Sequence, residues 1–303
     1  MAEGFLLELN FSTLKQTLEE KLLIVGGNKK YGQVLILAGG AGSGKGFILS
    51  NLIGMGGYKV VDPDAFKIAF LRRKEIVKNY PEITSKCNPD MVPTSDKPCL
   101  KDPSTVSKLH MIMRELGWEE KTKKALVDMR AGRTKDTLPN IVYDRTMKET
   151  GGLLDDLKAL KDAGYQPENI HMVWVLTDYR IAMKQNLARD RVVPPEILFA
   201  THNGAAKTML GMTQGGYPST SLINGEVWTV VGRANLVSSG RGGSYIAAPN
   251  PSDTNALKFI RLKKAGGSFD TPDQVWNKLG CHICNKTPLE TTPICSDKPP
   301  KCS

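Results

Sequence analysis

Nine consecutive residues have the types and spacing that hold a phosphate group: Gly39, Gly40, Ala41, Gly42, Ser43, Gly44, Lys45, Gly46 and Phe47. The glycines let the backbone curl so that successive N–H groups point at an anion. Lys45 adds a positive charge that would reach the β- and γ-phosphates of a nucleotide. An expected strand at 34–38 precedes this phosphate loop and an expected helix follows it, which adds a positive dipole end. This context makes the match to a Walker A motif credible. ATP is the expected nucleotide, and the sequence leaves GTP open.

The residue after Lys45 departs from the usual pattern. Ser or Thr normally stands there and helps to hold Mg²⁺ through its hydroxyl group, whereas this chain has Gly46. The Lys-Gly pair resembles the adenylate-kinase version of the loop, although that version continues with Thr and this chain with Phe47. Mg²⁺ is therefore expected to find its ligands elsewhere, and the sequence does not identify them.

Two carboxylates, Asp62 and Asp64, follow a second expected strand at 59–61. Ligands of open α/β sheets bind at the carboxyl edge of the strands, so these side chains are expected beside the phosphate loop. A carboxylate there can take a proton from an attacking hydroxyl or hold Mg²⁺ through water. The competing interpretation is an Asp that caps the next helix.

Two arginines, Arg189 and Arg191, end an expected helix at 181–191, just before Pro194. Their guanidinium groups could stabilise the charge on a transferred phosphoryl group, which makes 189–195 a candidate lid. The alternative is a pair of surface arginines that compensate the helix dipole.

The elements that must position these residues alternate along the chain. Expected strands at 140–144, 171–176 and 226–231 are separated by helices, one of them at 151–163. Strand–helix–strand repetition predicts an α/β fold with a mostly parallel sheet and helices on both faces.

At this point the chain resembles a known family. The glycine loop, the segment Asp62-Pro63-Asp64-Ala65-Phe66-Lys67 and the later Arg-x-Arg-Val-x-Pro element resemble the zeta-toxin group of P-loop kinases. The Asp before a small residue and Phe is also similar to chloramphenicol phosphotransferase, a relative. The resemblance covers roughly 34–206.

This resemblance implies a P-loop kinase fold and roles for single residues. Asp64 would be the base that activates a substrate hydroxyl, with Asp62 beside it at the substrate. Asp144 and Thr146 take the places of an acidic residue and a Thr that hold substrate or metal in the family. A capping Asp and a turn Thr are the alternative for this pair.

Composition favours an anionic partner. The chain of 303 residues has a formal net charge of +10 and a pI near 9.2, which suits a nucleotide or nucleic acid. Solubility charge alone is the other interpretation. Six cysteines at irregular spacing, without a secretory signal, favour a reducing compartment, hence the cytoplasm, or the host cytoplasm for a phage protein. No apolar run is long enough to predict a membrane span.

The chain divides into segments by composition. We expect an N-terminal helical segment, a P-loop kinase domain with an inserted Pro-rich loop, a basic β-rich extension and a Cys/Pro/Lys-rich frayed tail. The helical segment covers 1–31, and the kinase domain covers 32–232 with its inserted loop at 79–105. The β-rich extension covers 233–280, and the tail covers 281–303.

Two features of the C-terminal part leave alternatives open. Cations and aromatics interleave on the basic strands, which fits either a nucleic-acid surface or a solvated sheet edge; they are Trp228, Tyr245, Lys258, Phe259, Arg261, Lys263 and Lys264. Half of a zinc ribbon, Cys281-x₂-Cys284, is followed by Cys295 and Cys302, so zinc is an alternative to the frayed tail.

These observations predict an ATP-dependent kinase that phosphorylates a hydroxyl. The favoured acceptor is the hydroxymethyl group of 5-hydroxymethyluracil in bacteriophage DNA, a step of thymidine hypermodification that the resemblance and the charge imply. The alternative is a zeta-toxin-type kinase of a UDP-linked amino sugar. A second alternative is a non-catalytic nucleotide-binding module. The sequence leaves open the oligomeric state and an antitoxin-like partner.

Overall fold

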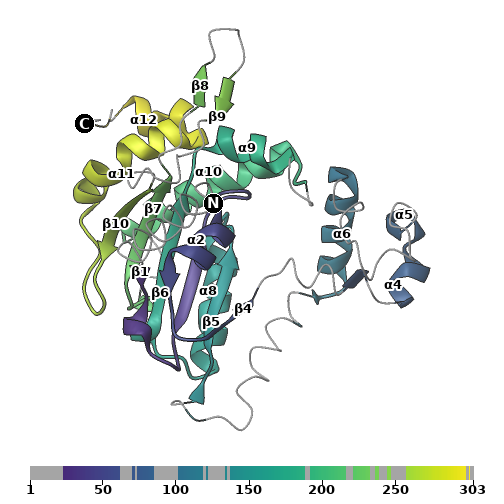
Figure 1. The fold of residues 1–303 in the computed structure, drawn as a ribbon, viewed down its shortest axis with the longest axis horizontal. Helices are drawn as coiled ribbons and strands as arrows, with labels where there is room; N and C mark the ends of the chain where they lie inside the picture. The colour runs from purple at the N-terminus through teal and green to yellow at the C-terminus, as the bar shows by residue number, and fades with distance from the viewer. Residues whose placement is uncertain are drawn as a thin grey trace, which may run out of the picture.

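The computed structural model consists of a six-stranded sheet, helices packed on it, and a group of helices to one side (Figure 1). The residues that it describes are 23–61, 70–71, 74–84, 102–118, 121, 134, 137–187, 192–215, 221–232, 236–238, 244–246, 257–297 and 300. The expected N-terminal helical segment lies almost entirely outside them.

The described elements follow one another as short strands and helices. The strands are β1 (Leu23–Ile24), β2 (Val34–Ala38), β3 (Ile53–Gly54), β4 (Tyr58–Val61), β5 (Asn140–Arg145), β6 (Ile170–Leu176), β7 (Val227–Gly232), β8 (Leu236–Ser238), β9 (Ser244–Ile246) and β10 (Leu257–Lys263). The α-helices are α2 (Lys45–Asn51), α4 (Lys74–Asn79), α5 (Pro81–Thr84), α6 (Pro103–Glu115), α8 (Thr150–Asp162), α9 (Tyr179–Leu187), α10 (Pro195–Thr213), α11 (Pro272–Lys286) and α12 (Pro293–Ser296). Short 3₁₀ turns are η1 (Gly26–Asn28), η4 (Pro167–Asn169) and η6 (Pro288–Thr291). None of these helices combines the length and the hydrophobicity that a membrane span requires.

The main sheet has the strand order β10-β7-β6-β2-β5-β4. β2 pairs in parallel with β5 on one side and with β6 on the other, and β4 and β7 extend these two sides in parallel. β10 runs antiparallel to β7 at the edge. The expected α/β fold with a mostly parallel sheet is confirmed, and β10 belongs to the expected C-terminal β-rich extension. Because the chain turns to opposite sides of β2, the carboxyl end of β2 is the switch point at which such sheets bind ligands.

Helices cover both faces of the sheet because its central strand is apolar on both sides. All five residues of β2 are at most 1% exposed. Val34, Ile36 and Ala38 pack into a core shared with α8, α10 and α11. Leu35 and Leu37 face the opposite way, into a core with α2 and the β1–β3 pair. A strand buried on both faces is typical of parallel sheets, and it fixes the phosphate loop rigidly at its end.

A satellite group, α4 to α6, has its own small core. Phe70, Ile83 and Leu109 are fully buried there, and the ring of Phe70 meets Trp118 edge-on at 5.3 Å. Figure 1 shows this group beside the sheet. α6 begins at the N-cap Asp102, whose carboxylate accepts a hydrogen bond from the Ser104 N–H group. The segment expected as a loop at 79–105 thus contains α5 and the start of α6, and 85–101 lie outside the described residues.

The C-terminal segment is helical, so the expectation of a frayed tail was wrong. α11 begins with a reciprocal capping box between Thr271 and Gln274, which supplies partners for two N–H groups at the start of the helix. Val275, Leu279 and Ile283 then recur every four residues on one side and pack into the main core. The burial of this side is what holds the segment on the sheet.

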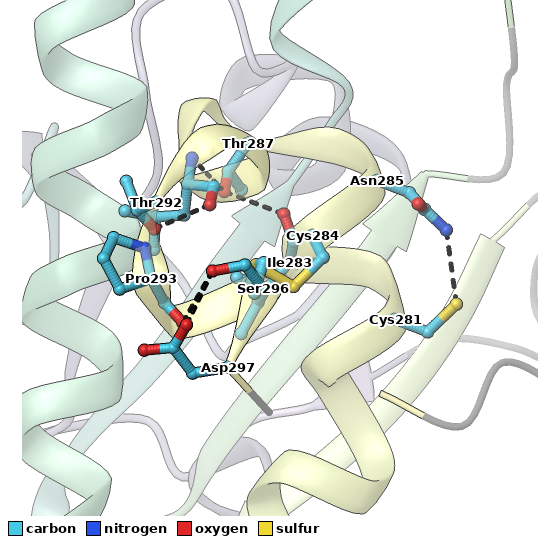
Figure 2. The surroundings of a disulfide bond; sticks show 11 residues. Cys281, Ile283, Cys284, Asn285, Thr287, Thr292, Pro293, Ser296 and Asp297 are labelled. Carbon is cyan, nitrogen blue, oxygen red and sulfur yellow. Dashed lines mark hydrogen bonds between the residues drawn. A yellow bond between two sulfur atoms is a disulfide. The ribbon is translucent and has the colours of Figure 1, made fainter. Parts of the chain in front are cut away.

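A disulfide joins Cys284 of α11 to Cys295 of α12 (Figure 2). Cys281 is also disulfide-bonded. Both cysteines of the Cys-x₂-Cys pair are therefore oxidised, which contradicts the alternative that this pair binds zinc. The described residues contain no cluster of His, Cys, Asp or Glu suited to a metal. Disulfides persist in oxidising surroundings, so the expectation of reduced cysteines was wrong for this segment.

We expect the double substitution of Cys284 and Cys295 by Ser to destabilise the protein by about 2–3 kcal/mol. The disulfide lowers the conformational entropy of the unfolded chain, and the effect is moderate because the loop that it closes is short. The loop is short because the two residues are separated by 11 positions. Urea unfolding followed by tryptophan fluorescence would measure the difference. Dithiothreitol should lower the midpoint of the natural protein more than that of the variant; equal shifts would contradict the prediction.

Candidate active site

The phosphate loop takes a backbone path that its glycines permit. Gly44, the residue before α2, has a φ of 88°, in the left-handed region that other residues enter only with strain. At Gly39 a Cβ atom would lie 2.7 Å from both the Val175 carbonyl oxygen and Ser43 Oγ. The loop therefore lies against the end of β6 so closely that no side chain fits. The buried Ser43 hydroxyl has no hydrogen-bond partner among the described residues, as expected of a group left for a ligand oxygen.

Lys45 folds back over the loop. Its Nζ atom donates hydrogen bonds to the carbonyl oxygens of Gly39 at 2.9 Å and Gly40 at 3.3 Å. The same atom lies 3.5 Å from Oδ1 of Asp144. Asp144 reaches this position because β5 pairs with β2 in a register that places it opposite Leu37. The sheet thus joins two residues that the sequence analysis considered separately.

The residues next to Asp144 differ in their exposure and in their contacts. Thr146 is exposed. Arg145 forms an ion pair with the buried Asp156 of α8, and its guanidinium group lies 5.2 Å from the centre of the Tyr143 ring. Arg145 thereby ties the end of β5 to α8 and leaves Asp144 at the phosphate loop. Burial raises the pKa of Tyr143, partly offset by the Arg145 charge, so its hydroxyl stays neutral.

Four predicted site residues lie outside the described part of the chain. Asp62 and Asp64 come directly after Val61, the last residue of β4, which pairs with Tyr143 at the same edge of the sheet as Asp144. Arg189 and Arg191 fall between Leu187 and Val192. Their roles therefore stay predictions.

One buried side chain before the candidate lid bonds to a residue within it. Asn186, which is 2% exposed, donates from Nδ2 to the Val193 carbonyl oxygen at 2.7 Å and accepts from the Val193 N–H group at 2.9 Å. α10 begins two residues later. The described residues on either side of Arg189 and Arg191 are therefore bonded to each other.

Sequence reasoning missed the side chains that brace the phosphate loop from other elements. Thr177, after β6, donates its hydroxyl to the Ser43 carbonyl oxygen at 2.7 Å. Thr201 and His202 of α10 both bond to Ala41. The only signal was a His and a Thr in an apolar helix, which does not reveal a contact across 160 residues.

A buried acidic residue stands at the end of β6. Asp178, which is 4% exposed, accepts two hydrogen bonds of 2.9 Å from the Arg180 guanidinium group. Arg180 also donates to the Asn285 carbonyl oxygen of α11. Burial lowers the pKa of Lys286, although the Asp178 charge partly offsets this. The C-terminal helix is thus linked electrostatically to the edge that carries the site.

Not all the cationic side chains of the basic C-terminal strands lie at the surface of the protein. Lys263 is 5% exposed and donates to the Gly225 carbonyl oxygen and to Asn224 Oδ1, both at 3.1 Å. Burial lowers its pKa. Arg261 lies over the Trp228 ring at 5.4 Å and faces Glu226 at 3.9 Å. The expectation that Lys263 belongs to a basic surface was therefore wrong.

Comparisons with known proteins find similarity only among solved structures. No family model matches the sequence, and no curated protein matches it. The AvrRxo1-ORF1:-ORF2 complex with ATP is 13% identical in sequence and has a TM-score of 0.46. The match covers 89% of this chain and 70% of the chain in that structure. The native form of that complex is 13% identical, with coverages of 92% and 69% and a TM-score of 0.48. A structure of the PezAT chromosomal toxin–antitoxin system of Streptococcus pneumoniae is 12% identical, with coverages of 80% and 82% and a TM-score of 0.36. Overlaps of this size do not by themselves assign an activity.

Proposed function

We propose that this chain is an ATP-dependent phosphotransferase that transfers the γ-phosphoryl group to a hydroxyl. The single observation that carries the proposal is the position of Lys45, bonded across the phosphate loop and 3.5 Å from Asp144. A fixed ammonium group at the end of a glycine loop neutralises phosphate charge. The unpartnered hydroxyl of Ser43 adds a donor that such a ligand would use.

Asp144 is the group that fits Mg²⁺ here. Mg²⁺ commonly binds through one or two carboxylates, with phosphate oxygens and waters as its other ligands. Asp144 supplies one such carboxylate at the loop, and Gly46 supplies none. When bound, the ion would neutralise charge on the phosphates.

The transfer requires a base and a cationic clamp besides the loop. On this proposal the acceptor oxygen bonds to the γ-phosphorus, the bond from that phosphorus to its bridging oxygen breaks, and ADP leaves. The hydroxyl proton passes to Asp64. Arg189 and Arg191 balance the charge on the transferred group, with Asp62 and Thr146 at the acceptor.

The proposal also names the molecule whose hydroxyl accepts the phosphoryl group. The net charge of +10 supports 5-hydroxymethyluracil in DNA, and such a base would have to be flipped out of the duplex. The burial of Lys263 and the pairing of Arg261 favour the alternative, a UDP-linked amino sugar.

Transfer of labelled γ-phosphate from ATP would be measured with three acceptors: 5-hydroxymethyluracil duplex DNA, ordinary duplex DNA and a UDP-linked amino sugar. We expect label on the modified DNA, with binding that weakens steeply as salt rises. Label only on the sugar nucleotide would replace the DNA assignment and keep the kinase. No label on any acceptor, with ATP still bound, would favour the non-catalytic module.

A further inference from the structure

The peptide groups on either side of Ala41 are held by two neighbouring side chains of α10. The Ala41 N–H group donates to Thr201 Oγ1 at 3.0 Å. Its carbonyl oxygen lies 2.9 Å from His202 Nε2. A carbonyl oxygen only accepts, so Nε2 carries the proton. Both polar groups of one loop residue are therefore satisfied by side chains instead of by water or a ligand.

The loop and the histidine ring fit together without spare room. A Cβ atom at Gly40 would lie 2.3–2.5 Å from three atoms of the His202 ring. Thr201 and His202 are 5% and 4% exposed. Any other residue at position 40 would displace the ring or the loop, so this glycine serves the contact with α10.

His202 also donates its hydrogen bond without bringing a charge. Burial, together with the Lys45 charge, lowers its pKa to about 4, although the bond to Ala41 and the Asp178 charge act in the opposite direction. Lys45, Asp178 and the Ala41 carbonyl are the groups on α2, the β6–α9 connection and the loop that act on it. At neutral pH the ring is therefore uncharged and adds no cation beside Lys45.

We propose that Thr201 and His202 are positioning residues that lock the phosphate loop in its phosphate-binding conformation. The inference rests on the proposed function, because it assigns these residues to nucleotide phosphates. Free rotation of the peptides around Ala41 would let the loop N–H groups point away from a common centre. Their bonds to α10 remove that freedom before a ligand arrives, and preorganisation reduces the cost of binding.

The helix that braces the loop also continues from the candidate lid. Val193, held by Asn186, is separated from the start of α10 by Pro194. Ala182 of α9 and Leu198 of α10 share a small core with Val193, and Ala41 packs against it. Ala41 of the phosphate loop and Val193 of the candidate lid therefore pack on the same small core.

Three variants of the full chain test the inference: Thr201→Val, His202→Leu and His202→Gln. Valine has the shape of threonine without the hydroxyl, leucine lacks the donor, and the glutamine amide can replace Nε2–H. The matched control is His171→Leu. His171 is equally buried, but it donates to Gln33 and accepts from the Glu226 N–H group at the opposite edge of the sheet.

ATP affinity by calorimetry, and kcat and KM for transfer, are the measurements. We expect Thr201→Val and His202→Leu each to weaken ATP binding about tenfold, because each leaves one buried peptide group of the loop without its hydrogen-bond partner. The loss should appear in KM for ATP and in kcat, and His202→Gln should restore most of it. His171→Leu should lower the thermal midpoint while ATP affinity stays within about twofold.

The outcomes separate this inference from the proposed function. His202→Leu or Thr201→Val with natural ATP affinity, or an equal loss in His171→Leu, would overturn the positioning role. If the natural protein binds no ATP, the proposed function fails on its own. The Ala41 amide would then be followed by hydrogen exchange in the protein alone. Faster exchange in Thr201→Val would support the loop contact, and unchanged exchange would overturn it.

Discussion

Substituting Lys45 by Met should reduce phosphoryl transfer by about a hundred- to a thousandfold, the usual effect of removing one preorganised donor at developing charge. Methionine keeps the apolar stem but loses the ammonium group that bonds to Gly39 and Gly40 and faces Asp144. Initial rates of γ-phosphate transfer would measure the effect. ATP affinity should fall as well, because the same group contacts bound phosphate.

Two companions make that result specific. Lys158→Met changes an exposed lysine of α8, away from the loop, and should keep the full rate. Asp144→Asn, which keeps the shape of the side chain, should impair transfer and raise the Mg²⁺ concentration needed for it. A Lys45→Met protein with more than one tenth of the natural rate would exclude the proposed role of the ammonium group.

The second large effect is expected in acid. Burial lowers the pKa of both His171 and His202 from 6.5 to about 4 in the folded protein. In the unfolded chain both titrate near pH 6.5. Above pH 6.5 both histidines are neutral in the folded protein and in the unfolded chain, so they do not change the free energy of unfolding. Below pH 6.5 the histidines take up protons in the unfolded chain but stay neutral in the folded protein. The free energy of unfolding therefore falls until the pH reaches about 4.

The size of this effect follows from the gap between the two pKa values. A gap of 6.5 minus about 4 corresponds to about 3–4 kcal/mol per histidine at 1.4 kcal/mol per pKa unit. Urea midpoints at half-unit steps between pH 7.5 and 4.5 would show it, with a slope that steepens below pH 6.5. His202→Gln and His171→Gln should each remove about half of the added slope. A flat profile down to pH 5 in the natural protein would contradict the prediction.

Local sequence determined the parts of the site that are contiguous. The strand at 34–38, the glycine loop and the helix after Lys45 are one uninterrupted segment, so their types and order predict them directly. The later parallel strands were predicted because each is a short apolar run between turn residues, and all are present within a residue or two of the expected bounds. The start of α11 also carried its own signal, Thr271 three residues before Gln274, although the nearby cysteines and prolines favoured a frayed tail.

Tertiary structure decided the contacts between distant segments. Asp144 meets Lys45 through the register of β5 on β2. Thr201 and His202 meet Ala41 because α10 packs against the sheet that carries the phosphate loop. Lys263 was expected at the surface, but the register shift between Arg261 and Lys263 places it inside, next to the buried Leu262. The sequence by itself determined which residues could bind phosphate, since that depends on neighbours along the chain. Strand pairing and side-chain packing decided which other side chains hold the phosphate loop in place. The interaction energies of pairing and packing arise only when distant segments meet.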